Sequence, residues 1–191
     1  MPFTETGIPG LLVFEPNIIR DARGYFFESF NSKIWKEKGI TSEYVQDNQA
    51  YSTRGILRGL HYQLNPNAQA KLVRVIEGEV LDVVVDLRKG SPSFGKTFSI
   101  ILSAENHKQM YVPRGFAHGY CVLSSTALFF YKCDNFYSKE SERGIAFNDS
   151  ALNIDWKIPA GEMLLSDKDK LNKPFSEAEM NFVFDEKNIF H

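Results

Sequence analysis

Seven short apolar runs, separated by turn residues, constrain the fold of this sequence more than any other feature. They follow one another closely from Tyr51 onward, a spacing typical of a β-sandwich or β-barrel. No long stretch has the 3.6-residue apolar period of an amphipathic helix, which argues against a helical bundle. We therefore predict a mainly β fold with a few short helices. Its central strands should cover residues 57–63, 71–77, 79–87, 97–103, 109–112, 119–124 and 126–133.

Turn and cap residues divide these runs. Gly78 stands between two predicted strands, and we expect it at the tip of a hairpin. Residues 113–116, Pro-Arg-Gly-Phe, predict a turn. Asn31 and the serine after it can cap a short helix that runs to Lys38 and is ended by Gly39.

The length and apolar content fit one domain. The chain has 191 residues, and 43% of them are hydrophobic, enough for a sizeable core. We expect a single domain over residues 1–191. In it, N-terminal strands over about 1–50 and a C-terminal tail over about 160–191 pack on the central strands.

Charge and cysteine content narrow the class of protein further. The formal net charge is −2 with the charges interspersed, whereas a general nucleic-acid binder needs a basic face. No apolar stretch reaches 18 residues, and the N-terminus lacks the pattern of a signal peptide. Cys121 and Cys133 lie inside apolar runs, which predicts reduced, buried thiols in a cytoplasmic protein. A disulfide between them is the alternative.

The run Leu57–Gln63 contains a histidine in a strand-like context. Strict strand alternation divides this run between two faces. One face has Leu57, Gly59, His61 and Gln63, and the other has Arg58, Leu60 and Tyr62. A buried histidine needs a polar partner. Taken alone, His61 fits either a base in a pocket or a core histidine bonded to a neighbour.

A second histidine follows the turn at 113–116. The spacing Pro-x-Gly-x-x-His, which ends at His118, resembles the second half-motif of the cupin jelly roll. A metal-binding cupin also needs a His-x-His segment, but here the corresponding place reads His61-Tyr62-Gln63. Because catalytic metal sites usually have three protein ligands, we predict no metal site.

A set of short motifs extends along nearly the whole chain. They are Arg-Gly-Ile-Leu-Arg-Gly-Leu-His-Tyr-Gln (54–63), Lys-Leu-Val-Arg-Val (71–75), Asp-Val-Val-Val-Asp-Leu-Arg (82–88), Ser-Pro-Ser-Phe-Gly (91–95), Val-Pro-Arg-Gly-Phe-Ala-His-Gly-Tyr (112–120), Tyr-Lys-Cys (131–133), Asn-Asp (148–149) and Leu-Ser-Asp-Lys-Asp (165–169). Together these motifs resemble those of the dTDP-4-dehydrorhamnose 3,5-epimerases, which are cupin-fold sugar-nucleotide enzymes, from about Gly7 to the region of Phe175. This resemblance implies a jelly-roll β-barrel, a homodimer, no metal and no cofactor.

The resemblance also implies catalytic roles. The family substrate is a 4-keto-6-deoxyhexose on thymidine diphosphate, and protons on the carbons beside its ketone are weakly acidic. His61 takes the role of base, with Asp169 as the carboxylate that orients it. Tyr131 is the proton donor on the opposite face, and Lys71 faces the enolate oxygen. Without the resemblance, Asp169 fits a solvated loop carboxylate or a helix cap. Tyr131 fits a core tyrosine with its hydroxyl at the rim, and Lys71 fits a lysine at a strand end whose charged group reaches solvent.

Substrate-binding positions are implied in the same way. Arg23 and Arg58 match positions for the diphosphate, which suits the arginine fork. Tyr137 matches a position that can stack on thymine. In this family the N-terminal segment can complete the partner's site, so Arg23 and Glu28 are candidates to act across the dimer. The other substrate-binding positions are Glu28, Gln46, Asp47, Asn48, Lys71, His118, Glu142 and Lys168.

Several functions stay open at this point. A relative that inverts one carbon only, and a ketoisomerase on a related sugar nucleotide, are compatible with the same base and carboxylate. A metal-dependent cupin conflicts with the missing His-x-His segment. A non-catalytic sugar-binding cupin would be expected to lack the base or its partner, and both are present.

Overall fold

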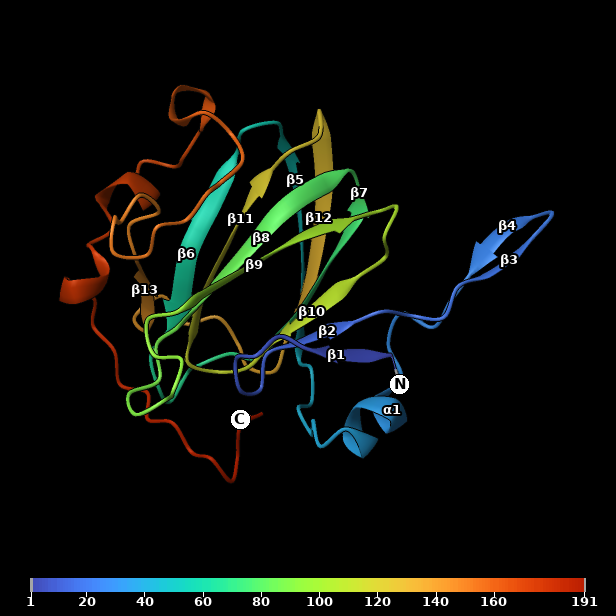
Figure 1. Ribbon diagram of the computed structural model, residues 1–191, viewed down its shortest axis with the longest axis horizontal. Coiled ribbons are helices and arrows are strands. Elements are labelled where there is room, and N and C mark those ends of the chain that lie inside the picture. Colours follow the sequence, from blue (N-terminus) through green and yellow to red (C-terminus); the bar gives the residue numbers. More distant parts are fainter. Residues whose placement is uncertain (1, 191) are drawn as a thin grey trace.

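The computed structural model describes residues 2–190, and its body consists of two antiparallel β-sheets that share a core (Figure 1). The larger sheet contains, in spatial order, β1 (Phe3–Glu5), β2 (Leu12–Phe14), β10 (Gln109–Val112), β7 (Lys71–Glu77), β12 (Thr126–Cys133) and β5 (Gln46–Thr53). The smaller sheet contains β13 (Glu142–Gly144), β6 (Leu57–Gln63), β11 (Phe116–Val122), β8 (Glu79–Asp86) and β9 (Thr97–Ser103). The prediction of a mainly β fold with few short helices is confirmed.

The remaining elements are small. A separate hairpin, β3 (Ile19–Asp21) with β4 (Gly24–Phe26), precedes helix α1 (Ser32–Glu37). Three short 3-10 turns, Ala160–Glu162, Asp169–Leu171 and Phe175–Glu177, lie in the C-terminal segment. Asn31 caps α1 as expected, because its side chain accepts the backbone N–H of Lys33 at 3.1 Å.

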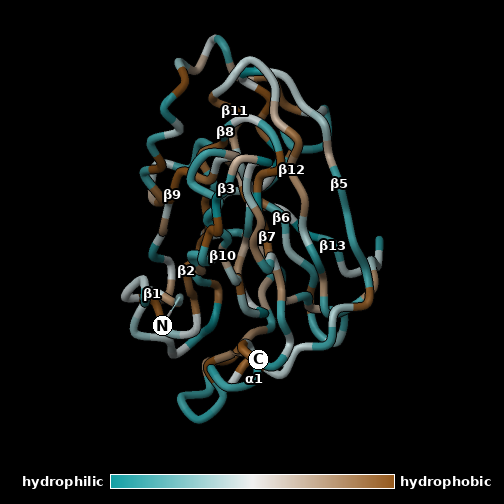
Figure 2. The backbone as a smooth tube through the Cα atoms, turned by 90° about the vertical axis from the view of Figure 1, so that its right-hand side faces the viewer, coloured by the Kyte–Doolittle hydropathy of each residue, from teal (hydrophilic) through white to brown (hydrophobic). Residues whose placement is uncertain are grey.

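Apolar side chains form three layers. The middle layer lies between the sheets, a second lies between the smaller sheet and the C-terminal segment, and a third lies between the larger sheet and α1. Strand β8 is buried on both faces: Val80 and Val84 point into the middle layer, and Val83 and Val85 into the second. Figure 2 shows hydrophobic stretches in the interior strands and a hydrophilic edge at β5.

Two sequence predictions about turns are wrong. Gly78 is not a hairpin tip, because β7 and β8 belong to different sheets and the chain passes from one sheet to the other there. Its φ of 77° allows this sharp corner. Phe116 was assigned to a turn, yet it begins β11, because it pairs with Asp86 of β8.

The β3–β4 hairpin projects away from the body of the molecule (Figure 1). Its apolar side chains are exposed, with Ile19 at 58%, Tyr25 at 55% and Phe26 at 66%. The C-terminal segment instead packs on the smaller sheet, where Trp156 and Phe182 enter the second apolar layer. The predicted domain, 1–191, also includes Met1 and His191, which lie outside the described residues.

Two further predictions concern the cysteines and the membrane. Cys121 and Cys133 are both buried and free, so the alternative of a disulfide between them is not observed. Within residues 2–190, no helix has the length and apolar character required to cross a membrane.

Candidate active site

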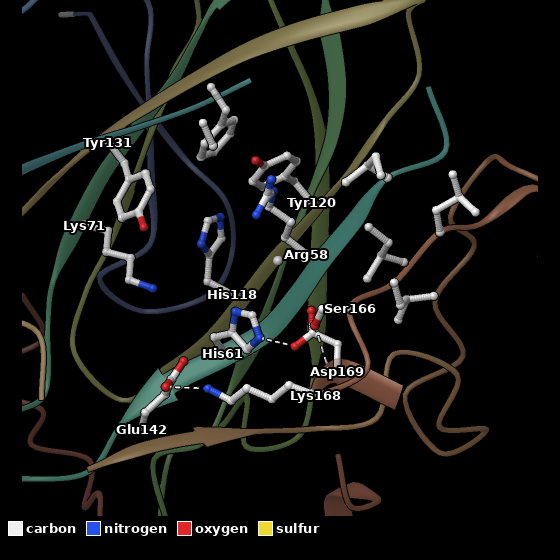
Figure 3. Close-up of a pocket in the computed structure, with 17 residues that line it drawn as sticks. Arg58, His61, Lys71, His118, Tyr120, Tyr131, Glu142, Ser166, Lys168 and Asp169 are labelled. Carbon is white, nitrogen blue, oxygen red and sulfur yellow. Dashed lines mark hydrogen bonds and ion pairs between the residues drawn. The ribbon is translucent and has the colours of Figure 1, made fainter. Parts of the chain in front are cut away.

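A cavity of about 520 Å³ lies between the two sheets (Figure 3). Strands of both sheets line it, and the segment 164–169 closes one side. Its walls mix aromatic and aliphatic side chains with a small number of ionisable groups, as in most small-molecule sites. Eight of the predicted site residues meet here: Arg58, His61, Lys71, His118, Tyr131, Glu142, Lys168 and Asp169.

A β-bulge on β6 puts Arg58 and His61 on the same face. His118 of β11 pairs with His61, and Tyr120 pairs with Arg58, so three residue steps on β6 match two on β11. The predicted strict alternation, which separated Arg58 from His61, is therefore wrong. Gly59 makes the bulge feasible, because a Cβ there would lie 2.5 Å from the Gly119 Cα.

His61 and Asp169 form a close pair. His61 Nε2 lies 2.5 Å from Asp169 Oδ1. The imidazole is 31% exposed and faces the cavity, whereas the carboxylate is 5% exposed. The sequence separates the two residues widely, and the 3-10 turn that begins at Asp169 brings them together.

Ser166 holds the turn that carries Asp169. Its Oγ accepts the backbone N–H of Asp169 at 3.1 Å. Burial pushes the pKa of Asp169 upward, but the hydrogen bond and charge of His61, helped by Ser166, outweigh burial and leave the pKa below its ordinary value. An ionised Asp169 accepts the Nε2 proton of a neutral His61, so Nδ1 keeps a free lone pair.

A second imidazole–carboxylate pair reaches the cavity wall through His118, with its carboxylate buried behind the ring. His118 Nε2 lies 2.9 and 3.0 Å from the two carboxylate oxygens of Asp82. Burial raises the pKa of Asp82, although the charges of His118 and Lys71 oppose the rise. Asp82 is not among the site residues predicted from the sequence. An aspartate inside the apolar strand Val80–Asp86 was the signal that could have identified it.

Lys71 and Tyr131 face the two histidines from the larger sheet (Figure 3). Lys71 Nζ lies 5.9 Å from the centre of the Tyr131 ring. Burial lowers the pKa of Lys71. It also raises the pKa of Tyr131 to about 12, so the phenol is protonated at neutral pH and can donate.

Polar side chains surround the mouth of the cavity. Glu142 forms an ion pair with Lys168 and accepts the Tyr137 hydroxyl at 2.7 Å. The pair lies below His61 in the view of Figure 3. Gln46 accepts the backbone N–H of Tyr137 at 3.1 Å and donates to Asn48 at 3.0 Å, which links β5 to this rim.

The structure does not bring every predicted binding residue to the cavity. Arg23 lies on the projecting hairpin with its side chain 90% exposed, and its guanidinium pairs with Asp21. Glu28 accepts a hydrogen bond from Asn31 near the start of α1. Asp47 alternates with Gln46 and lies on the outer face of the sheet in an ion pair with a lysine of β12.

The residues brought together here are an imidazole–carboxylate pair, a lysine and an opposing phenol in one cavity, which are the groups that an acid–base enzyme for a carbon acid uses. Within residues 2–190, no three His, Cys, Asp or Glu side chains are grouped closely enough to hold a metal ion.

Comparison with known proteins places the chain in one family. The family model described as dTDP-4-dehydrorhamnose 3,5-epimerase matches residues 5–177. The chain is 54% identical to the dTDP-4-dehydrorhamnose 3,5-epimerase of Shigella flexneri over 94% of this chain and 98% of the relative. The chain belongs to the dTDP-4-dehydrorhamnose 3,5-epimerase family.

Solved structures agree with this assignment. An epimerase from Legionella pneumophila, crystallised in complex with dTDP-4-keto-L-rhamnose, superposes with a TM-score of 0.91 at 45% identity, covering 96% of this chain and 98% of that chain. The fold is also similar to a 3'-monoepimerase from Streptomyces bikiniensis in complex with dTDP-quinovose, with a TM-score of 0.83 at 34% identity, covering 89% and 86% of the two chains. The predicted cupin-type fold and epimerase class are confirmed.

Proposed function

We propose that this protein inverts carbons 3 and 5 of dTDP-4-dehydro-6-deoxy-D-glucose to give dTDP-4-dehydro-L-rhamnose. The observation that carries this proposal is the 2.5 Å contact between His61 and Asp169 in the same cavity as Lys71 and Tyr131. Membership of the family and the likeness to a relative with a bound keto sugar support the substrate.

His61 Nδ1 removes the proton from the carbon next to the ketone. Nε2 cannot serve, because it is bound to Asp169. The electron pair of the broken C–H bond moves into the C=C bond of the enolate, and the ketone oxygen becomes negative. Asp169 then stabilises the imidazolium that forms.

Lys71 and Tyr131 complete the inversion. A cation held near the enolate oxygen lowers the barrier, because negative charge develops there only in the reaction. Tyr131 donates its proton to the opposite face of the carbon, which forms the new C–H bond and leaves a phenolate. Proton exchange of the imidazolium and phenolate with water restores the starting state.

The nucleotide lies at the mouth of the cavity in this proposal. Arg58 and Lys168 bind the diphosphate, and Tyr137 stacks on the thymine ring. Glu142, which now pairs with Lys168, releases it to the incoming phosphate. Gln46 and Asn48 lie on the inward face of β5 beside this rim, where they can contact the sugar nucleotide.

We also propose a homodimer in which the β3–β4 hairpin of one subunit reaches the partner's cavity. Arg23 and Glu28 lie away from their own cavity, and the hairpin exposes large apolar side chains. A partner that covers the hairpin would bury that apolar surface and bring Arg23 to a diphosphate. Asp47, on the outer face of its sheet, remains a predicted binding residue without a cavity contact.

Mixing two inactive variants tests whether the hairpin of one subunit completes the cavity of its partner. A dimer of one His61→Ala and one Arg23→Ala subunit has one site with both an intact base and an intact hairpin. Refolding equal amounts together should restore up to about one quarter of the wild-type activity. If each hairpin serves its own subunit, both sites stay defective and no activity returns.

The reaction itself is tested by NMR of the wild-type protein with dTDP-4-keto-6-deoxyglucose in deuterated water. Deuterium should enter at both carbon 3 and carbon 5, with the L-rhamno product. Exchange at carbon 3 alone would instead indicate a monoepimerase, the second candidate, which the likeness to the Streptomyces bikiniensis enzyme favours. No exchange at either carbon would contradict both functions.

We place this reaction in dTDP-rhamnose synthesis, in the cytoplasm and within one domain. The free cysteines support a reducing compartment. The C-terminal segment supplies Asp169 to a cavity built by the two sheets, which supports treating the chain as one functional unit.

A further inference from the structure

One hydroxyl group in the cavity wall, that of Tyr120, has no hydrogen-bond partner among residues 2–190. The Tyr120 hydroxyl is buried, and within residues 2–190 no hydrogen bond of acceptable geometry reaches it. The ring cannot turn freely to find one, because it stacks on Phe129 with centroids 4.1 Å apart and planes 17° apart. An unpaired buried hydroxyl lowers stability, so its presence calls for a role outside the resting structure.

Arg58 is the cation beside this hydroxyl (Figure 3). Burial raises the pKa of Tyr120, and the Arg58 guanidinium and the Ser52 hydroxyl oppose the rise, so both groups lie close to the phenol. Arg58 Nε already donates to Ser52 Oγ at 3.2 Å. Ser52 belongs to β5 of the larger sheet and Arg58 to β6 of the smaller one, so this contact spans the two sheets.

We propose that Ser52 and Tyr120 are positioning residues for Arg58, which they hold as a diphosphate-binding fork. This inference rests on the proposed function, because it takes a nucleoside diphosphate as the ligand. Arginine has five N–H donors in a fixed plane. Ser52 accepts from Nε, and Tyr120 accepts from a terminal nitrogen when the ligand draws the guanidinium inward. The remaining N–H groups then face the phosphate oxygens in one orientation.

Binding of thymidine diphosphate, measured by calorimetry, tests the proposal. Tyr120→Phe removes only the hydroxyl and should weaken binding about three- to tenfold, the usual net effect of one hydrogen bond. Ser52→Ala should weaken it to a similar extent, and Ser52→Thr should restore it. In an Arg58→Ala background, Tyr120→Phe should have no further effect.

Tyr62→Phe is the matched control. Tyr62 and Tyr120 are both 4% exposed, but the Tyr62 hydroxyl donates to the Glu179 carbonyl at 2.7 Å outside the cavity. Tyr62→Phe should lower the melting temperature and leave thymidine diphosphate affinity unchanged. Tyr120→Phe should show the reverse: an unchanged or higher melting temperature, a raised KM for the sugar nucleotide and a kcat within about twofold of wild type.

The outcomes separate this inference from the proposed function. Wild-type protein that binds no thymidine diphosphate would contradict both. Wild-type binding with an unchanged affinity in Tyr120→Phe would overturn the inference alone. An equal loss in the wild-type and Arg58→Ala backgrounds would also overturn it, because the hydroxyl would then act independently of Arg58.

Discussion

The cavity contains two imidazole–carboxylate pairs with the same groups in different surroundings. In the first, the His61 side chain is 31% exposed and Asp169 lies on a short 3-10 turn. In the second, His118 is 7% exposed and Asp82 is fully buried in the central strand β8. The first pair is open to the cavity through His61, whereas the second is buried and joins two adjacent strands, β8 and β11, of the smaller sheet.

Electrostatics separates the pairs in the same way. The pKa of Asp169 is lowered, so its carboxylate stays ionised and fixes the tautomer of His61. The pKa of Asp82 is raised by burial, with the charges of His118 and Lys71 opposing the rise. Identical residue types therefore give an accessible imidazole, which we propose as the base, in one place and a buried, rigid pair in the other.

Replacing each histidine should give the largest difference. His61→Ala should lower kcat about 10²- to 10⁴-fold, the usual contribution of a general base. His118→Ala should lower kcat about tenfold or less, because the family resemblance gives His118 a substrate contact and not the role of the base. Initial rates with dTDP-4-keto-6-deoxyglucose measure both, and a larger loss in the His118 variant would reverse the assignment.

Removing the carboxylate should destabilise the protein more in the second pair than in the first, which is the opposite of the order expected for the loss of kcat. Asp82→Ala should lower the free energy of unfolding by about 3–5 kcal/mol, because it leaves His118 buried without its partner. Asp169→Ala should cost about 1 kcal/mol, because water reaches the imidazole of His61. Urea denaturation measures both. Asp82→Asn, which keeps an acceptor for His118, is the control and should recover part of the loss.

The contributions of Asp169 and Asp82 to stability should depend on pH with opposite signs. The folded-state pKa of Asp169 lies below its ordinary value of 3.8, so the carboxylate contributes stability above pH 3.8 that is lost as the pH falls through the folded pKa. The folded pKa of Asp82 lies above 3.8, so its contribution is present below that pH and lost as the pH rises through the folded pKa.

Melting temperatures of Asp169→Asn and Asp82→Asn, compared with wild type from pH 7 to pH 3, test these signs. The advantage of wild type over Asp169→Asn should hold down to about pH 4 and then shrink. The melting temperature of wild type relative to that of Asp82→Asn should rise as the pH falls. Parallel curves for the two variants would contradict the distinction between the pairs.

The smallest expected effect concerns the support of Asp169. Ser166→Ala removes the acceptor for the Asp169 backbone N–H, and the loss of such a cap costs about 1 kcal/mol. We expect kcat to fall about three- to tenfold with little change in overall stability, because only the local turn loosens. Ser166→Thr keeps the hydroxyl and should retain activity. Equal losses in both variants would indicate that packing, rather than the hydrogen bond, positions the turn.

Local patterns made much of this fold predictable. The bounds of β6, β7, β9, β10 and β12 follow from apolar alternation and turn residues, which act within a few positions. Long-range contacts were not predictable in this way. The corner at Gly78 and the early start of β11 at Phe116 depend on which strands pair in the folded sheets.

The site shows the same limit. Residue types and the family resemblance identified His61, Tyr131 and Lys71, and the structure brings them to one cavity. The bulge that turns Arg58 toward His61 depends on contact between Gly59 and Gly119 on different strands. No local pattern contains such a contact, so strict alternation gave the wrong face.

Hydrogen exchange at the substrate carbons tests the role of His61 most directly. NMR in deuterated water should follow dTDP-4-keto-6-deoxyglucose with His61→Ala, His118→Ala and Tyr131→Phe proteins. We expect no deuterium at carbon 3 or carbon 5 with His61→Ala, exchange with His118→Ala, and exchange faster than net inversion with Tyr131→Phe. Deuterium incorporation by a folded His61→Ala protein at the wild-type rate would contradict the assignment of His61 as the base.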